Sequence, residues 1–159
     1  MRLVPESAMS GPAMTSEVVG GAGARDDTRP MAGVITTYVE AWEAGDLDAV
    51  LASYAPDIVA HYGGTSAFAG SHRGFARFVE VLAETAARSD RRLCSVEALH
   101  DDGDRGSVFV TESVRIDGEI HELQRALRVR VVDDRIAEVW LYDLDQHRVD
   151  QAWSQPPGG

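Results

Sequence analysis

The strongest constraint on the fold is a change in hydrophobic pattern near Asp90. Before this residue, apolar side chains recur at the three- and four-residue spacing of helices; after it they follow the pattern of strands. Four strand-length segments follow in succession: Arg92–His100, Ser107–Ile116, Glu119–Val131 and Arg135–Leu144. Helices followed by a long antiparallel meander predict an α+β fold.

Turn residues separate the predicted strands. Asp102–Asp104 and Asp133–Asp134 mark two connections, and Asp117–Gly118 is a strong signal for a two-residue hairpin turn. Because strands of this length must curl to bury one face, we expect a curved antiparallel sheet wrapped around three N-terminal helices. The expected shape is a cone-shaped barrel with an apolar cavity, which is a natural site for a small molecule.

The part of the chain ahead of the meander is predicted to be mainly helical. The predicted elements are helices over residues 34–42, 47–54 and 75–86, a strand over residues 57–62 and a loop over residues 63–74. Gly45 ends the first helix, Asp46 caps the second and Pro56 closes it. These boundaries place Tyr38 and Trp42 on one apolar helix face.

The composition excludes several classes of protein. The single cysteine, Cys94, allows no internal disulfide and no Cys-rich zinc site, and all 15 basic residues are arginine, which excludes Schiff-base and P-loop lysine chemistry. The net charge of −11 argues against a nucleic-acid partner, and no apolar run is long enough to span a membrane. Without His-x-x-x-His spacing or a Gly-rich nucleotide loop, we expect no metal and no cofactor.

The predicted domain occupies about three quarters of the 159 residues. Residues 1–30 are rich in Gly, Ala, Ser and Pro and are predicted to be a disordered N-terminal extension, residues 31–153 the domain, and residues 154–159 a flexible tail. The N-terminal stretch lacks the apolar core of a signal peptide, so a cytoplasmic location is expected.

Several segments together resemble a known superfamily. Tyr38–Trp42, Glu43–Val50 and Tyr54–Asp57 are similar to the opening of NTF2-like (cystatin-like) proteins, and Gly70–Gly74 and Arg135–Trp140 match later elements. Within that superfamily the SnoaL-like polyketide cyclases and ketosteroid isomerases are most similar. The resemblance covers nearly all of residues 34–153 and implies the fold rather than one reaction, because this fold carries many functions.

The resemblance also implies positions for a site. Tyr38 falls where the isomerases keep an oxyanion-binding tyrosine, and His61 falls where they keep the carboxylate that moves the proton. In the family's strand register, one face of each strand lines the cavity. The polar residues expected there are Tyr38, His61, Glu112, His121, Arg125 and Asp143. The apolar residues expected to contact substrate are Trp42, Leu123, Leu127, Val139 and Leu141.

Each polar residue has a purely structural alternative. His61 at a strand end and Tyr38 on a helix face are compatible with ordinary backbone bonding and core packing, while Glu112, His121 and Arg125 are compatible with an ion-pair cluster on an exposed sheet face. A shift of one residue in the register would instead turn Tyr142 inward. Trp140 and Tyr142, predicted to face outward, suggest a homodimer through the outer sheet face.

Three functions remain open from the sequence. The first is a cofactor-free acid–base enzyme acting on an apolar oxygenated small molecule, a cyclase or isomerase of natural-product biosynthesis in which His61 moves the proton. The second is an epoxide-opening hydrolase or cyclase, because Arg125 with Glu112 and Asp143 loosely resembles the Asp–Arg–Asp grouping of such enzymes in this superfamily. The third is a non-catalytic module that binds a small molecule or dimerises.

Overall fold

The computed structural model describes residues 33–158. The predicted extension over residues 1–30 therefore lies outside the described residues. The elements, in chain order, are α1 (Val34–Glu43), α2 (Leu47–Ala52), β1 (Tyr54–Tyr62), β2 (Gly70–Arg73), α3 (Phe75–Ser89), β3 (Arg92–Asp101), β4 (Arg105–Ile116), β5 (Glu119–Val132), β6 (Arg135–Asp143) and α4 (Gln146–Trp153). No helix among the described residues is both long and apolar enough to cross a membrane.

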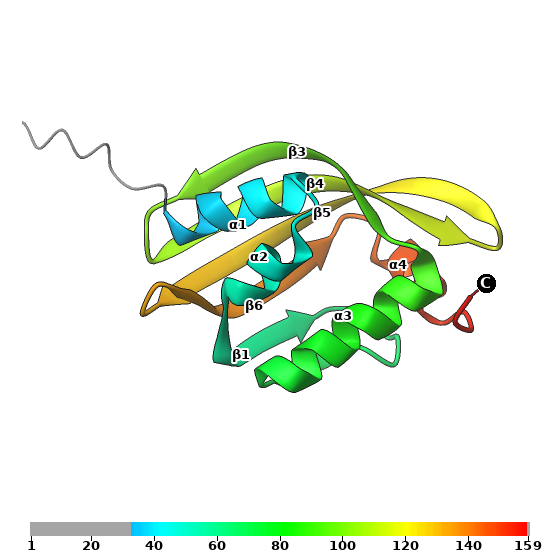
Figure 1. Ribbon diagram of the computed structural model, residues 1–159. Helices are drawn as coiled ribbons and strands as arrows, with labels where there is room; N and C mark the ends of the chain where they lie inside the picture. The colour runs from blue at the N-terminus through cyan, green and yellow to red at the C-terminus, as the bar shows by residue number, and fades with distance from the viewer. Residues whose placement is uncertain (1–32, 159) are drawn as a thin grey trace, which may run out of the picture.

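The six strands form one curved sheet in the order β2-β1-β6-β5-β4-β3. Neighbouring strands are antiparallel except β1 and β6, which run parallel. The sheet is open, with β2 and β3 as its edges, and the parallel pair of β1 and β6 departs from the wholly antiparallel sheet that was predicted. The α+β class and the curvature are confirmed (Figure 1).

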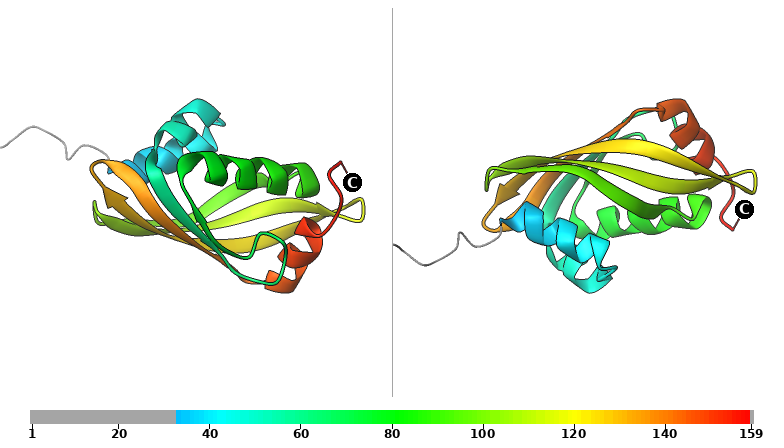
Figure 2. Two further views of the ribbon diagram at one scale, coloured as in Figure 1. Left: turned by 90° about the horizontal axis from the view of Figure 1, so that it is seen from below. Right: turned by 90° about the horizontal axis from the view of Figure 1, so that it is seen from above.

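The helices α1, α2 and α3 cover the concave face of the sheet, as both views in Figure 2 show. All three helices precede the meander β3–β6, as predicted, with β1 and β2 between α2 and α3. Tyr54, predicted at the end of the second helix, begins β1 instead. A fourth helix, α4, was not predicted; it packs against α3, β4 and β6.

Local sequence explains the boundaries of the elements. Asp46 caps α2 by accepting a hydrogen bond from the backbone N–H of Ala49 at 3.1 Å. The predicted hairpin turn is confirmed, because Asp117 and Gly118 adopt φ angles of 51° and 83° between the paired residues Ile116 and Glu119. These φ values are the left-handed ones that a two-residue hairpin turn requires.

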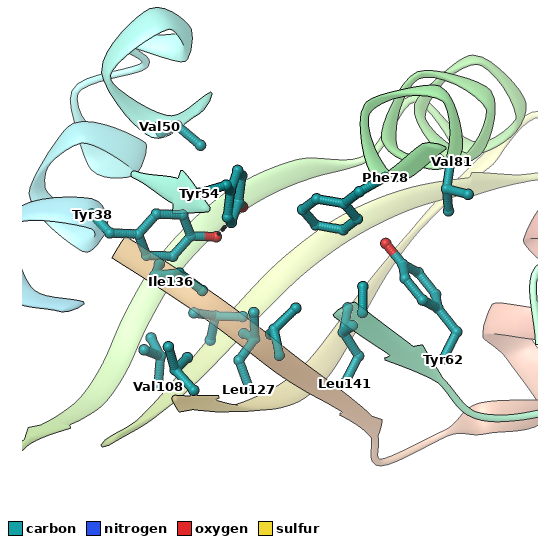
Figure 3. Packing of buried hydrophobic residues seen from close by; sticks show 14 of the residues in the cluster. Tyr38, Val50, Tyr54, Tyr62, Phe78, Val81, Val108, Leu127, Ile136 and Leu141 are labelled. Carbon is teal, nitrogen blue, oxygen red and sulfur yellow. Dashed lines mark hydrogen bonds between the residues drawn. The ribbon is translucent and has the colours of Figure 1, made fainter. Parts of the chain in front are cut away.

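The core lies between the concave sheet face and the helices (Figure 3). Alternation along β4, β5 and β6 buries one side chain in two, and the buried set is the one predicted from the register. It includes three polar side chains, Glu112, Arg125 and Asp143, within an otherwise apolar layer. The segment predicted to be a tail makes contacts at Gln155, whose side-chain amide donates to the backbone of Arg115 at 3.0 Å.

Candidate active site

A cavity of about 240 Å³ lies between the helices and the sheet. Its walls are mostly apolar and aromatic and come from α1, α2, α3 and strands β1, β3, β4, β5 and β6. Four of the five residues predicted to contact substrate line it: Trp42, Leu127, Val139 and Leu141. The fifth, Leu123, is buried in the core but is not on the wall of this cavity.

Two tyrosines form a hydrogen-bonded pair on the cavity wall. The hydroxyl of Tyr54 donates to that of Tyr38 at 3.0 Å, and Figure 3 shows the two hydroxyls facing each other. Burial raises the pKa of Tyr38 to about 12, although the hydrogen bond from Tyr54 opposes this shift. Burial likewise raises the pKa of Tyr54, so both groups are neutral near pH 7. Neither can act as a base there, but both can serve as neutral hydrogen-bond groups.

An ion-pair array occupies the polar end of the cavity. Arg125 Nη1 lies 3.0 Å from Glu112 Oε2, and Arg125 Nε donates to Asp143 Oδ1 at 2.6 Å. Arg91 Nε adds a contact of 3.4 Å to Glu112 Oε1. The side chains of Glu112, Arg125 and Asp143 are each at most 5% exposed. Three of the six residues predicted as polar site residues are therefore brought together by the structure.

The sheet register explains this array. Asp143 on β6 lies directly opposite Arg125 on β5, and Glu112 on β4 lies opposite Leu123, two residues along β5. Direct and diagonal cross-strand neighbours on one face are within reach of long side chains. Burial opposes the charge of Arg125, but Glu112 and Asp143 outweigh it and raise the pKa of the guanidinium above its ordinary value. Arg125 is thus a permanent cation held between two carboxylates.

The predicted placement of His61 in the cavity is wrong. Ala60 and Tyr62 on either side of it point into the core, so alternation along β1 turns His61 to the outer sheet face. There its Nε2 lies 2.8 Å from Glu138 Oε1 and its Nδ1 lies 2.8 Å from Ser71 Oγ. Its ring stacks on Trp140 at a centroid distance of 5.2 Å.

His121 also lies away from the cavity. It is half-exposed near the hairpin end of β5, where Arg148 Nη1 donates to its Nδ1 at 2.7 Å. It lines a separate surface hollow with Leu123 and Arg148. Tyr142 is exposed on the outer face, so the register shift that would have turned it inward is excluded.

The structure adds three polar wall residues that the sequence analysis missed: Tyr54, Tyr62 and Arg91. The alternation of Ile58, Ala60 and Tyr62 was a readable signal, because these apolar side chains share one face of the strand. Arg91 had no such signal, since an arginine next to a helix end is normally exposed. Among residues 33–158, no three His, Cys, Asp or Glu side chains converge as a group suited to a metal ion.

A family model for the SnoaL-like domain matches residues 35–139, about two thirds of the sequence. The chain belongs to the SnoaL-like domain family. The match includes both tyrosines of the hydrogen-bonded pair and two members of the ion-pair array, Glu112 and Arg125. No curated protein is similar enough in sequence to match this SnoaL-like domain.

Solved structures share the fold. A protein of unknown function with a cystatin-like fold from Xanthomonas campestris is 24% identical, with a TM-score of 0.70, over 77% of this chain and 96% of that one. A candidate polyketide cyclase from Pseudomonas putida is 21% identical, with a TM-score of 0.59, over 75% and 97%. The protein TerC, co-crystallised with polyporic acid, is 19% identical, with a TM-score of 0.63, over 75% and 95%. At these identities the similarity concerns the fold.

Proposed function

We propose that this SnoaL-like domain is a cofactor-independent enzyme that transfers a proton on an apolar, oxygenated small molecule, as in a cyclisation or isomerisation. The observation that carries the proposal is the buried ion-pair array at one end of an apolar cavity. An apolar pocket with a few convergent polar groups is the usual form of a small-molecule site. The crystallisation of TerC, a protein of this fold, with polyporic acid supports a small organic ligand.

Glu112 is the residue placed to move the proton. Among the residues that the structure describes it is the only carboxylate on the cavity wall, because Asp143 binds Arg125 without lining that wall and His61 lies on the outer face. Removal of a proton beside a carbonyl group leaves an enolate and a neutral Glu112 acid. Arg125 and Arg91 contact the same carboxylate and fix its orientation on the wall.

Asp143 acts as a positioning residue for the array. It holds Arg125 Nε at 2.6 Å, so the guanidinium presents Nη1 to Glu112. Hydrogen-bond donors on the same wall stabilise the negative charge that develops on the substrate oxygen. Water is largely excluded from this end, which strengthens each of these interactions.

Hydrogen exchange in heavy water tests the proposal without knowledge of the natural substrate. β-Tetralone, an apolar bicyclic ketone, carries exchangeable protons beside its carbonyl, and magnetic resonance follows their loss. We expect the wild-type protein to accelerate this exchange and Glu112→Gln to reduce the acceleration by at least about a hundredfold, the range typical of a general base. Glu122→Gln, a substitution at an exposed residue of β5, is the matched control. Equal acceleration by Glu112→Gln and the control, with both proteins folded, would contradict the role of Glu112.

Epoxide opening is the second candidate, and the carboxylate–guanidinium–carboxylate order of Glu112, Arg125 and Asp143 favours it. In this reaction one carboxylate accepts a proton from water, the water oxygen bonds to an epoxide carbon as its C–O bond breaks, and the released epoxide oxygen takes the proton back from the carboxylic acid. Incubation of indene oxide in water labelled with heavy oxygen distinguishes the two reactions. A diol carrying one labelled oxygen, formed only with intact Glu112, would favour hydrolysis over isomerisation.

A further inference from the structure

Two hydrogen-bond donors on the cavity wall have no acceptor among the residues that the structure describes. The Tyr62 side chain is buried, 4% exposed, and its hydroxyl makes no hydrogen bond. Arg91 pairs with Glu112 through Nε, but its Nη1 is buried without a partner. Because buried polar groups in native proteins are almost always paired, these two donors call for an acceptor that the chain does not supply.

Trp153 holds both donors at the same end of the cavity. Its ring centroid lies 5.5 Å from that of Tyr62, and the guanidinium carbons of Arg91 and Arg125 lie 6.0 Å and 5.5 Å from it. Figure 3 shows the Tyr62 hydroxyl directed away from the backbone of β1 and toward Phe78 and Val81 of α3, into the space above the sheet. The Tyr62 hydroxyl thus points into the cavity, and Arg91 lines the same cavity with its Nη1 buried.

The hydroxyl of Tyr38 differs from that of Tyr62 in its hydrogen bonding. The resemblance to the isomerases assigns the oxyanion-binding role to this residue, but its hydroxyl already takes part in the hydrogen bond from Tyr54. Tyr62 has no such engagement, so a ligand oxygen gains more there, where an otherwise unpaired donor is satisfied. Tyr38 keeps its own proton while it accepts from Tyr54, but Tyr62 and Arg91 are the wall residues with a buried donor that makes no hydrogen bond among the described residues.

The charges around these donors favour a neutral acceptor. Arg91 and Arg125 bring two positive charges, and Glu112 and Asp143 bring two negative ones, so the array is balanced. A bound carboxylate would leave a net buried negative charge, which is costly. A carbonyl oxygen would satisfy the donors and leave the balance unchanged.

We propose that Tyr62 and Arg91 together bind the carbonyl oxygen of an apolar ketone of about two fused rings. The inference rests on the proposed function in so far as the same cavity holds the substrate, and it names the substrate class and the residues that orient it. The size follows from the cavity of about 240 Å³, since a dry cavity of about 150 Å³ accepts benzene. Burial raises the pKa of Tyr62, which keeps its proton available as charge develops on the substrate oxygen.

Calorimetric titration with three matched ligands tests the inference in the full-length protein. The ligands are β-tetralone, its hydrocarbon tetralin and the corresponding tetralin carboxylate. We expect the ketone to bind more tightly than the carboxylate, and Tyr62→Phe to weaken ketone binding by about tenfold while tetralin binding is unchanged. Tyr142→Phe, which removes an exposed hydroxyl on the outer face, is the matched control.

Several results would overturn the inference. Tyr62→Phe would weaken the binding of ketone and hydrocarbon equally, or Tyr38→Phe would lose more ketone affinity than Tyr62→Phe. Alternatively, the carboxylate would bind most tightly of the three ligands, or the ketone would not bind at its solubility limit. Failure here is distinguishable from failure of the proposed function. Proton exchange that depends on Glu112 but not on Tyr62 would leave the function standing, whereas ketone binding that depends on Tyr62 without any exchange would leave only the binding site.

Discussion

At the scale of single residues, His61 shows how strongly strand alternation controls function. Its imidazole is bound on both sides, by Ser71 and Glu138, and is covered on one face by Trp140. Hydrogen bonds from His61 and Arg130 outweigh the slight burial of Glu138 and lower the pKa of its carboxyl group. These contacts tie β1 to its neighbours on the outer face and leave the ring no access to the cavity.

We therefore predict that His61→Ala leaves proton exchange on β-tetralone within about twofold of the wild-type rate and lowers the free energy of unfolding by about 1 kcal/mol, the usual net value of such hydrogen bonds. Denaturant unfolding and the exchange assay measure the two quantities. Ser71→Ala is the matched control, since it removes one of the same contacts without touching the ring. Loss of exchange in His61→Ala with unchanged stability would show that the ring reaches the substrate after all.

A sequence pattern could place some of the site residues but not all of them. Glu112, Arg125 and Asp143 could be placed because three long strands alternate regularly and the strand register implied by the family resemblance gives the inward face. The prediction for His61 was wrong because the alternation of Ala60 and Tyr62 along β1 turns His61 outward, against the position implied by the resemblance. The hydrogen-bond state of each group depends on three-dimensional contacts, so the unpaired hydroxyl of Tyr62 could not be foreseen.

At the scale of elements, strong patterns were predictable and short elements were not. The helix α3, predicted over residues 75–86 and found over Phe75–Ser89, and the hairpin of β4 and β5 carry long periodic patterns and a specific turn, and both were predicted. β2 has four residues and depends on pairing with β1, while α4 has eight residues with few apolar ones. Such elements are stabilised by tertiary packing more than by local propensity.

The helix α4 is short, but it has a large effect on the site. Asp145 caps it by accepting from the backbone N–H of Arg148 at 3.1 Å, and Asp150 binds the backbone N–H of Thr65 at 3.0 Å. The helix ends on Trp153, which is 2% exposed and packs against Tyr62, Arg91 and Arg125. An element that the sequence pattern did not predict thus positions the donors that are proposed to bind the substrate oxygen.

At the scale of the whole molecule, the outer face of the sheet carries large apolar side chains that are exposed. Phe109, Ala126 and Tyr142 lie side by side across β4, β5 and β6, and Phe109 and Tyr142 are 48% and 53% exposed. Leu144, at the end of β6, is 79% exposed. Contiguous exposed apolar residues of this kind mark interaction surfaces. Two copies of the chain can bury the same face against each other about a two-fold axis.

We predict a homodimer formed through this face, with a mass in solution of twice the 17.2 kDa chain. Phe109→Glu places a charge within the apolar row, where pairing about a two-fold axis buries it in the interface, so it should yield monomers. Ala83→Glu, on the exposed side of α3, is the matched control and should leave the dimer intact. Light scattering measures both masses, and a wild-type mass of one chain would contradict the dimer. Because the cavity is lined by the helices and the concave face of the sheet, the monomeric variant should still exchange protons on β-tetralone, which separates assembly from catalysis.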